Sequence, residues 1–576
     1  MAPLADAALF VALVAVVMPL VLVLPIRHVE RMAIFMFGFV LAASLLLLHG
    51  EISNVATVML SAGIAVQVMK SGGLRVERLD PLVRRTLPWM VATCLGTAIV
   101  LPISWNWLES RAIQRLSSVS GRTPNILILV WDTVRSQDLS TYGYDRDTSP
   151  NLTALAKGGI VFERAIAPSS WTLPSHASLF TGRWAHELST ISGAPLDSEN
   201  PTLPEVLSDN GYATAAFVAN QYVCNRDSGL GRGFLRFDDF SALSTEFVLS
   251  CQVGRRLTTS PLLRRWTAWQ DFWGRKSAER VNADFLEWLD RRPHRPFFAF
   301  LNFYDAHQPY FAPDLYYRQF GPPKPQEDRS VVAGIRHADV VELHANSPSQ
   351  QSEQQQRYDA SIAYLDACLG RLIDALQTRG ILENTLVILT SDHGEHFGEH
   401  GLQGHGNSLY RPLLHVPLVI RLPGDVPMGL RLQEPVSLRD VPATVVDLAG
   451  CRRGCQLPGN SLANLWHKTR IRTCDAVLAS VGTAAPDGTA NRMDAVIAAG
   501  LHYIRYGDGR EELFDFFKDP AESDDLIKSD NVREPLSRIR AMAEKQLTEP
   551  LNEESRDRPI RFARRRGLPY HPRPVP

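Results

Sequence analysis

Three apolar runs of strand length stand out after residue 120, and each is followed within two residues by an acid. The runs and their acids are Asn125–Trp131 with Asp132, Pro296–Phe303 with Asp305, and Thr385–Thr390 with Asp392. A short, continuous apolar run predicts a strand buried on both faces, as in a parallel sheet covered by helices. Ligands of α/β proteins bind beyond the carboxyl ends of such strands. The pattern therefore predicts an α/β fold with a site at one edge of the sheet.

A hydroxyl group occupies a constrained place in the stretch Ser169–Gly182. Pro174 disfavours helix for Leu173 but is tolerated in a first helical turn, so a helix is expected to begin close to Thr172. Unpaired N–H groups and the helix dipole favour an anion at that end. Thr172 is therefore a candidate nucleophile. The alternative is that its side chain is an ordinary helix N-cap.

The segment Ser391–Glu395 places an acid and a histidine next to each other, directly after a predicted strand. Together with Asp132 and Thr172, Asp392 and His393 form a candidate set of three oxygen ligands and one nitrogen ligand. This mixture suits one divalent ion, with Zn²⁺ or Mn²⁺ favoured and Ca²⁺ as an alternative. The alternative role for Asp132 is to cap the turn that follows its strand.

Four apolar stretches open the chain, at about 8–26, 32–49, 53–69 and 87–105. Their length predicts four membrane-spanning helices. Basic residues lie in the loop 27–31 and in the loop 70–85, whereas the loop after the second stretch has no Lys or Arg. The positive-inside rule then places both basic loops in the cytoplasm and everything after residue 107 outside. We therefore expect a multi-pass protein of the cell membrane with an extracytoplasmic catalytic domain.

Composition limits the classes of partner. A net charge of −1 gives no bulk affinity for nucleic acid. Seven cysteines in 576 residues are too few for a disulfide framework, although Cys451 and Cys455 are close enough for a small-loop disulfide, with two separate thiols as the alternative. The stretch 321–356 is rich in Pro, Gln and Ser and is expected to be a loop, followed by a helix from about Tyr358 to Arg379.

The motif Thr172-Leu173-Pro174-Ser175-His176 resembles the C-or-S-x-P-S-R nucleophile motif of the sulfatase family, in the alkaline phosphatase superfamily. Ser391–Glu395 and Glu512–Leu526 are similar to later family segments. The resemblance implies N-terminal transmembrane helices followed by a sulfatase-like α/β sandwich, with a mainly parallel sheet and a small C-terminal α+β subdomain. The expected divisions are 1–107 (transmembrane), 108–122 (linker), 123–455 (catalytic), 456–548 (C-terminal subdomain) and 549–576 (a basic tail, expected to be disordered).

The resemblance also implies roles for single residues. His307 and His405 match positions that contact the ester or its leaving group, and Asp132, Thr172, Asp392 and His393 match the metal site. The chain departs from the family at Thr133, where a second Asp is common. It departs again at Val218–Gln221, where sulfatases have G-K-W-H-L-G and supply Lys and His to the sulfate.

The residue at the nucleophile position bears on the substrate class. Sulfatases convert Cys or Ser there to formylglycine, whereas oxidation of a Thr side chain could yield only a ketone, so no formylglycine is expected. Thr nucleophiles occur in phosphoryl-transferring relatives. The sequence therefore predicts a membrane-anchored metalloenzyme that cleaves or transfers a phosphoester or phosphodiester group, with a lipid or envelope glycan as candidate substrate. The alternatives are a sulfuric ester hydrolase without formylglycine and a non-enzymatic protein with a degenerate domain.

The predicted topology can be tested with a reporter fused after residue 122. We expect a reporter that works only after export to be active at this position, because the basic loops that precede it are predicted to lie in the cytoplasm. A matched fusion within the loop 70–85 should behave in the opposite way. Labelling of the region after residue 122 from the cytoplasm would contradict the topology.

Overall fold

The computed structural model describes residues 35, 39, 42, 54–70, 106–119, 123–239, 276–292, 295–310, 312–321, 348–451, 457–467, 476–484 and 490–547. The chain divides into two compact units. One comprises residues 1–111, 240–274 and 326–334, and the other comprises residues 112–239, 275–325 and 335–576. The α/β fold and all candidate site residues belong to the second unit.

The described part of the first unit includes the helix α3, Asn54–Lys70. Of the four predicted membrane spans, only the third is described over its helical length, as this helix of 17 residues. Among the described residues, no helix combines the length and the apolar character needed to cross a membrane. The spans at 8–26 and 87–105, most of 32–49, the tail 549–576 and Cys455 lie outside the described residues.

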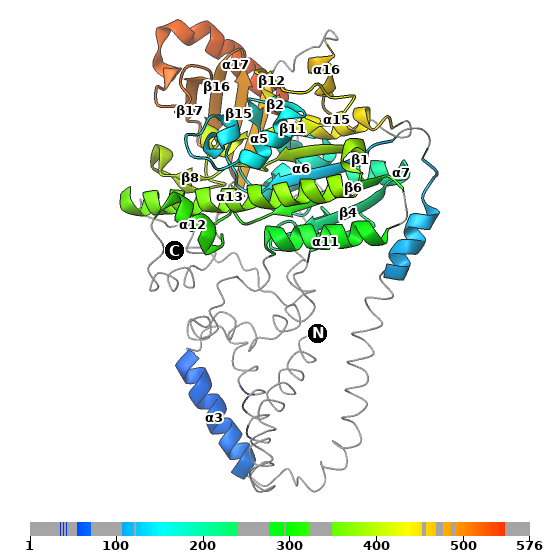
Figure 1. The fold of residues 1–576 in the computed structure, drawn as a ribbon. Coiled ribbons are helices and arrows are strands. Elements are labelled where there is room, and N and C mark those ends of the chain that lie inside the picture. Colours follow the sequence, from blue (N-terminus) through cyan, green and yellow to red (C-terminus); the bar gives the residue numbers. More distant parts are fainter. Residues whose placement is uncertain are drawn as a thin grey trace. The chain divides into compact units, whose positions relative to one another are not determined.

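An eight-stranded sheet forms the centre of the second unit, in the order β12-β2-β11-β7-β1-β6-β4-β5 (Figure 1). Its strands are β1 Asn125–Trp131, β2 Ile160–Phe162, β4 Ala213–Val218, β5 Arg236–Asp238, β6 Phe297–Phe303, β7 Thr385–Thr390, β11 Leu418–Arg421 and β12 Leu430–Leu432. β1 pairs in parallel with β6 and β7, and β4 pairs in parallel with β5 and β6. Only β11 runs antiparallel to its neighbours, β7 and β2. The prediction of a mainly parallel α/β sheet is therefore confirmed.

The register of the central strands brings their carboxyl ends level. Val130 of β1 pairs with Asn302 of β6 on one side and with Thr390 of β7 on the other. Asp132 and Asp392 each lie two residues beyond these paired positions. The two acids therefore leave the same edge of the sheet at the same height, although 260 residues separate them in the chain.

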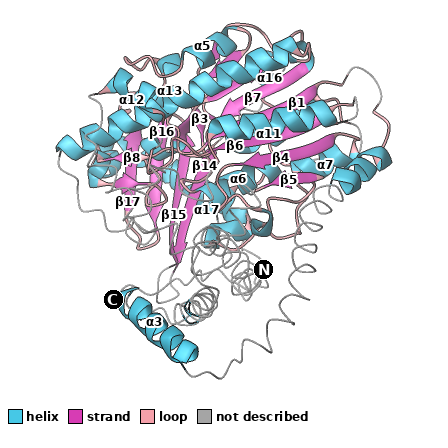
Figure 2. Cartoon of the chain, turned by 60° about the horizontal axis from the view of Figure 1, so that its bottom comes forward, coloured by secondary structure: helices cyan, strands magenta, loops and turns pink. Residues whose placement is uncertain are grey.

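Helices cover both faces of this sheet (Figure 2). Side chains of β1 alternate between two apolar clusters, so Ile126 and Ile128 belong to one, whereas Leu127 and Leu129 belong to the other. The first cluster includes residues of α6 Thr172–Thr181, α7 Leu203–Asp209 and α15 Val441–Leu448. The second includes residues of α5 Pro150–Lys157, α11 Ala278–Arg291 and α13 Pro348–Thr378. A strand that faces helices on both sides must be apolar throughout, which explains the unbroken runs in the sequence.

The helix α13 corrects one expectation. It begins at Pro348, so the prediction of a loop through residue 356 is wrong for its last nine residues. Gln, which recurs in this segment, is a good helix former. The segment has no buried apolar positions at helical spacing, so the sequence pattern gives no sign of the helix. The helix ends at Thr378, and Gly380 after it has a φ of +67°, as expected for a helix stop.

A second sheet follows the central one in the chain. It is antiparallel and comprises β14 Val477–Ala484, β15 Ala490–Ala498, β16 Leu501–Tyr506 and β17 Glu511–Asp515. The helix α17, Arg533–Leu547, packs on one of its faces. Residues of the other face, such as Ile497 and Ile504, join the same apolar cluster as α6. Short elements complete the description: β3 Ala165–Ile166, β8 His396–Phe397, β9 Gln403–Gly404, β10 His415–Val416, β13 Val436–Ser437, α12 Asp314–Phe320, α14 Arg411–Leu414 and α16 Ala463–Trp466.

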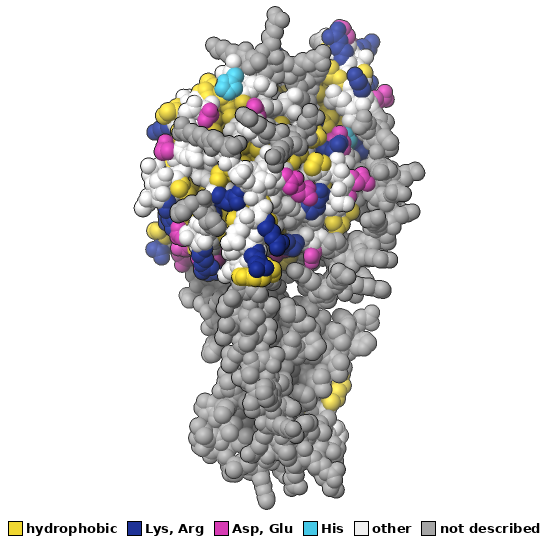
Figure 3. All heavy atoms as spheres, turned by 90° about the vertical axis from the view of Figure 1, so that its right-hand side faces the viewer, with side chains coloured by type: hydrophobic (Ala, Val, Ile, Leu, Met, Phe, Trp, Pro, Cys, Tyr) yellow, Lys and Arg dark blue, Asp and Glu magenta, His cyan; other side chains and the backbone are white. Residues whose placement is uncertain are grey.

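Charged side chains of both signs are mixed on the described surface. On the face in Figure 3, Lys and Arg side chains lie among Asp and Glu side chains. This distribution agrees with the net charge of −1.

The end of α6 generates a stability prediction. Gly182 has a φ of +71°, and a Cβ atom on it would lie 2.1 Å from the carbonyl oxygen of Pro458. Gly182→Ala should therefore cost about 1–2 kcal/mol for the left-handed backbone and roughly 2 kcal/mol more for the clash. Gly380→Ala is the matched control, because its φ is +67° and a Cβ atom there meets nothing within 4 Å. Thermal unfolding should separate the two variants, and equal melting temperatures would contradict the packing around Gly182.

Candidate metal and nucleophile site

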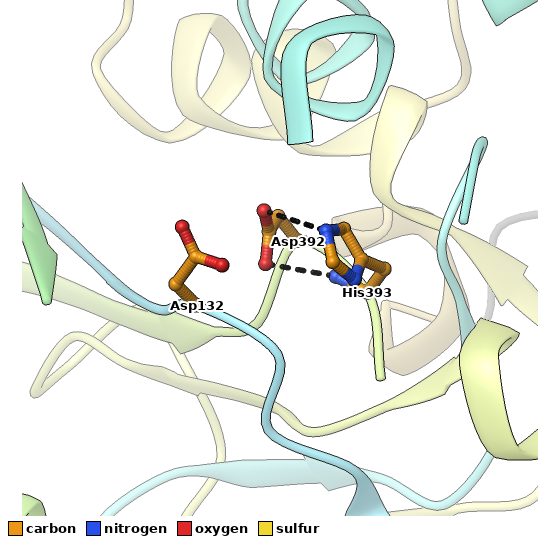
Figure 4. Close-up of side chains that lie close together, drawn as sticks. All are labelled: Asp132, Asp392 and His393. Carbon is orange, nitrogen blue, oxygen red and sulfur yellow. Dashed lines mark hydrogen bonds and ion pairs between the residues drawn. The ribbon is translucent and has the colours of Figure 1, made fainter. Parts of the chain in front are cut away.

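Three buried side chains converge beyond the ends of β1 and β7. Asp132 follows β1, and Asp392 and His393 follow β7. One ligand atom from each lies within 4.8 Å of the others, and this is the one such group of acids, His and Cys that could hold a metal ion among the described residues. Figure 4 shows the two carboxyl groups and the imidazole side by side. The structure thus brings together three of the four predicted metal ligands as a single group.

The two carboxylates are only half satisfied by protein donors. Oδ2 of Asp132 accepts a hydrogen bond from the Asn220 side chain at 2.9 Å, and Oδ1 of Asp392 accepts from the backbone N–H groups of Thr133 and His393 at 3.2 and 2.9 Å. Oδ1 of Asp132 and Oδ2 of Asp392 are buried and have no hydrogen-bond partner among the described residues. Unpaired buried acceptors are costly, so these two oxygens fit a site for a cation.

The pKa values of both acids reflect this environment. Burial and the nearby Asp392 carboxylate raise the pKa of Asp132 to about 8, and burial raises the pKa of Asp392 to about 7. Two carboxyl groups that share a dry site resist ionisation together. A divalent cation would supply the missing opposite charge and hold both in the ionised form.

His393 is positioned as a neutral donor of one nitrogen lone pair. Its Nδ1 lies 2.9 Å from the carbonyl oxygen of Gly394, so Nδ1 carries the proton and Nε2 is the free acceptor. Nε2 faces the hydroxyl of Thr172 at 3.1 Å and Oδ2 of Asp392 at 3.4 Å. Burial lowers the pKa of His393 well below its ordinary value. A neutral imidazole with its second nitrogen bonded to a carbonyl is the usual form of a metal-ligating histidine.

Thr172 is the first residue of α6, and its hydroxyl points at His393. The N-cap of α6 is Trp171, with no side-chain cap hydrogen bond, so the N-cap interpretation of Thr172 is wrong. The alternative role for Asp132 also differs from the structure, because its side chain bonds to Asn220 rather than to the turn after β1. Thr172, the fourth residue of the predicted metal set, therefore adjoins the group through His393.

Two other side chains of α6 attach the helix to this site. The hydroxyl of Ser175 donates to the carbonyl oxygen of Asp392 at 2.7 Å. His176, which occupies the Arg position of the sulfatase-like motif, places Nδ1 2.8 Å from the carbonyl oxygen of Thr172 and 3.6 Å from Oδ2 of Asp392. Burial lowers the pKa of His176. These contacts hold the start of α6 against the end of β7.

The predicted catalytic histidines lie next to the group. The ring of His405 is 4.6 Å from that of His393 and 4.9 Å from that of His307, which follows β6. Nδ1 of His405 bonds to Glu395 at 2.9 Å, and Nδ1 of His307 bonds to the carbonyl oxygen of Gln308 at 2.8 Å. Burial lowers the pKa of His405, but the Glu395 carboxylate, with Asp132 and Asp392, raises it above its ordinary value. His405 is thus suited to carry a proton.

Sequence reasoning missed two participants. Asn220 lies in the segment that departs from the family pattern, and among the described residues it supplies the one side-chain hydrogen bond to Asp132. Its position two residues after the end of β4 could have indicated that it lies at the same edge of the sheet as the acids. Glu395 ends the motif Ser391–Glu395, but its pairing with His405 depends on the hairpin of β8 and β9 between them.

Comparison with known proteins finds relatives over most of the chain. The sulfatase family model matches residues 124–451, and a model described as N-sulphoglucosamine sulphohydrolase, C-terminal, matches residues 398–551. A sulfatase of Formosa agariphila is 24% identical over 431 residues, covering 69% of this chain and 82% of that protein. An arylsulfatase of Clostridium perfringens is 25% identical over 475 residues, covering 74% of this chain and 94% of that protein.

A solved structure supports the fold. The phosphonate monoester hydrolase of Agrobacterium radiobacter superposes with a TM-score of 0.58 at 22% identity, covering 75% of this chain and 96% of that one. Because the sulfatase model matches more than half of the chain, this protein belongs to the sulfatase family and is a hydrolase of ester bonds.

Proposed function

We propose that this chain is a metal-dependent enzyme that cleaves a phosphoester or phosphodiester, or transfers its phosphoryl group, through a covalent ester on Thr172. The observation that carries the proposal is the contact of the Thr172 hydroxyl with His393, 3.1 Å apart, inside the group of Asp132, Asp392 and His393. An attacking hydroxyl beside a metal-binding group is the arrangement that nucleophilic catalysis requires.

The four residues Asp132, Thr172, Asp392 and His393 would hold one divalent ion. The imidazole among three oxygen ligands favours Zn²⁺ or Mn²⁺ over Ca²⁺. When bound, the ion would lower the pKa of the Thr172 hydroxyl and withdraw charge from an ester oxygen. The two unpaired carboxylate oxygens are the independent sign that the residues fit such an ion.

The protein's own residues then account for the proton and the leaving group. The Thr172 hydroxyl gives up its proton to solvent, and Oγ1 then forms a bond to phosphorus while the bond from phosphorus to the leaving oxygen breaks. His405, protonated beside Glu395, gives its proton to the leaving oxygen, and His307 lies in contact with His405 to hold the same group. Water or an acceptor alcohol gives up a proton to His405 and attacks phosphorus, which releases Thr172.

Two observations favour phosphorus over sulfur. Thr172 cannot become formylglycine, since its Cβ carries a methyl group. The segment Val218–Gln221 has neither the Lys nor the His with which sulfatases contact sulfate, and its Asn220 is committed to Asp132. The fold itself is compatible with an ester of phosphorus, since it is also found in a phosphonate monoester hydrolase. A sulfuric ester hydrolase without formylglycine is the second candidate, favoured by the family match and by the arylsulfatase among the relatives.

The apolar N-terminal stretches and their basic loops support an anchor in the cell membrane, with the catalytic domain outside. An enzyme placed there has access to lipid head groups and envelope glycans. We therefore propose an ester in one of these two classes as substrate.

Metal binding should stabilise the protein more at pH 8 than at pH 5.5. In the metal-free protein the pKa values of Asp132 and Asp392 lie above the ordinary value, so the folded state binds more protons than the unfolded state between about pH 4 and pH 8. Stability of the metal-free protein therefore falls as the pH rises through that window. Bound Zn²⁺ or Mn²⁺ removes this loss, so the metal-induced rise in melting temperature grows with pH.

The control for this experiment is Asp132→Asn, which removes one charge and one ligand. Its metal-induced rise in melting temperature should be small at both pH values. Elemental analysis should show about one metal ion per wild-type chain. A wild-type protein that melts at the same temperature with and without metal at pH 8 would contradict the site.

Replacing the nucleophile tests the chemistry. Thr172→Ala should lower phosphodiester turnover by roughly three orders of magnitude or more, because the attacking oxygen is lost. The fold should persist, since Thr172 donates no helix cap and Asp132, Asp392 and His393 remain. Thr172→Ser should keep part of the activity, because a hydroxyl remains in place.

Intact mass spectrometry of the same samples separates the candidates. Wild-type protein quenched during turnover should carry a phosphoryl group that Thr172→Ala does not acquire. Melting temperature and metal content show whether each variant is folded and loaded. Full activity of folded Thr172→Ala would overturn the mechanism, and a sulfuryl adduct would establish the second candidate instead.

A further inference from the structure

Trp171 is the one partly exposed residue in a buried segment. From Ala165 to Gly182 all side chains are buried except that of Trp171, which is partly exposed. It immediately precedes Thr172 and has an extended backbone, with φ −136° and ψ 144°. A large apolar side chain is therefore kept at the surface directly beside the proposed nucleophile.

The position of the indole follows from two glycines that flank it. A Cβ atom on Gly406 would lie 3.8–3.9 Å from Cδ1, Cβ and Cγ of Trp171, and one on Gly193 would lie 3.7–3.9 Å from Cη2 and Cζ3. The indole thus extends from the backbone at Gly406 to the backbone at Gly193. Gly406 follows His405, so the ring also lies next to the proposed proton donor.

The surroundings leave part of this ring available to a ligand. Gly193 is exposed and Gly406 is partly exposed, and neither has a side chain with which to cover the indole. The buried part of the ring packs against the apolar cluster of α6, which fixes its orientation. No described residue accepts a hydrogen bond from the indole N–H. A rigid, partly exposed aromatic ring beside a reaction centre is suited to stacking.

We infer that Trp171 is a specificity-determining residue that receives the leaving group of the substrate by stacking, and that it selects a leaving group with a flat, apolar ring face. An aromatic ring and the C–H face of a hexose both have this chemistry. The inference rests on the proposed function, because it assumes that the ester reacts between Thr172 and His405. It adds the substrate class that this site prefers.

The test compares two esters whose leaving groups are equally acidic. Wild-type protein should hydrolyse a phenyl phosphodiester with a higher kcat/KM than a fluorinated alkyl phosphodiester of matched acidity. In Trp171→Ala the ratio of the two kcat/KM values should fall roughly tenfold, mainly through KM, because stacking contributes to ground-state binding. Trp171→Phe should restore most of the ratio.

Trp466→Ala is the matched control, because Trp466 is also partly exposed and packs against the same apolar cluster. It should leave the ratio at the wild-type value. Melting temperature and metal content verify that each variant is intact. A ratio that is unchanged in Trp171→Ala would overturn the inference, while turnover of both esters by the wild type would leave the proposed function standing.

Binding measurements decide the inference even if neither ester is turned over. By calorimetry, the metal-loaded wild type should bind phenylphosphonate roughly tenfold more tightly than methylphosphonate, and Trp171→Ala should lose this preference. A hexose 6-phosphate compared with glycerol phosphate distinguishes a sugar face from an aromatic ring. Equal binding of the ring-bearing and the ringless compounds by the wild type would overturn the inference.

Discussion

Two carboxyl groups held side by side in a dry interior are the constraint on which the rest of the site depends. Asp132 and Asp392 leave adjacent parallel strands at the same height, and each has one oxygen without a hydrogen-bond partner among the described residues. Their pKa values, about 8 and about 7, show how strongly this setting opposes ionisation without a cation. A bound divalent ion removes that opposition, so the same arrangement that weakens the metal-free protein creates affinity for metal.

The backbone around the carboxylates is shaped to hold them. Thr133 has a φ of +64°, a left-handed conformation that costs about 1 kcal/mol or more in a residue with a Cβ atom, and in this conformation its N–H donates to Asp392. At the position where the family resemblance implies a second acid, this chain thus has a residue whose backbone N–H donates to Asp392. Asn220 donates a hydrogen bond to Asp132 through its side chain. Strain of this kind persists only where surrounding contacts compensate for it, as they do at functional sites.

The helix α6 brings the Thr172 hydroxyl to the residues after β7. Ser175 bonds to the backbone of Asp392, and His176 bonds to the backbone of Thr172 inside the first turn. These contacts leave the Thr172 hydroxyl with His393 as its partner and leave Trp171 at the surface. The start of α6, docked on the end of β7, therefore places both the proposed nucleophile Thr172 and the partly exposed Trp171.

The sequence by itself determined the central strands and the start of α6, because burial on both faces and a proline in a first turn leave local patterns that need no knowledge of the fold. It also pointed to Asp132, Asp392 and His393, which the structure brings together, because the carboxyl ends of parallel strands meet at one edge of a sheet, whereas His307 and His405 were implied by the family resemblance. At 348–356 the composition predicts a loop where the structure has a helix, because no apolar period marks a helix segment without core positions. Only the tertiary structure decided that Asn220 donates to Asp132, that Glu395 pairs with His405 and that Trp171 stays partly exposed. These facts depend on strand register and on contacts between distant segments, and local propensity contains no information about either.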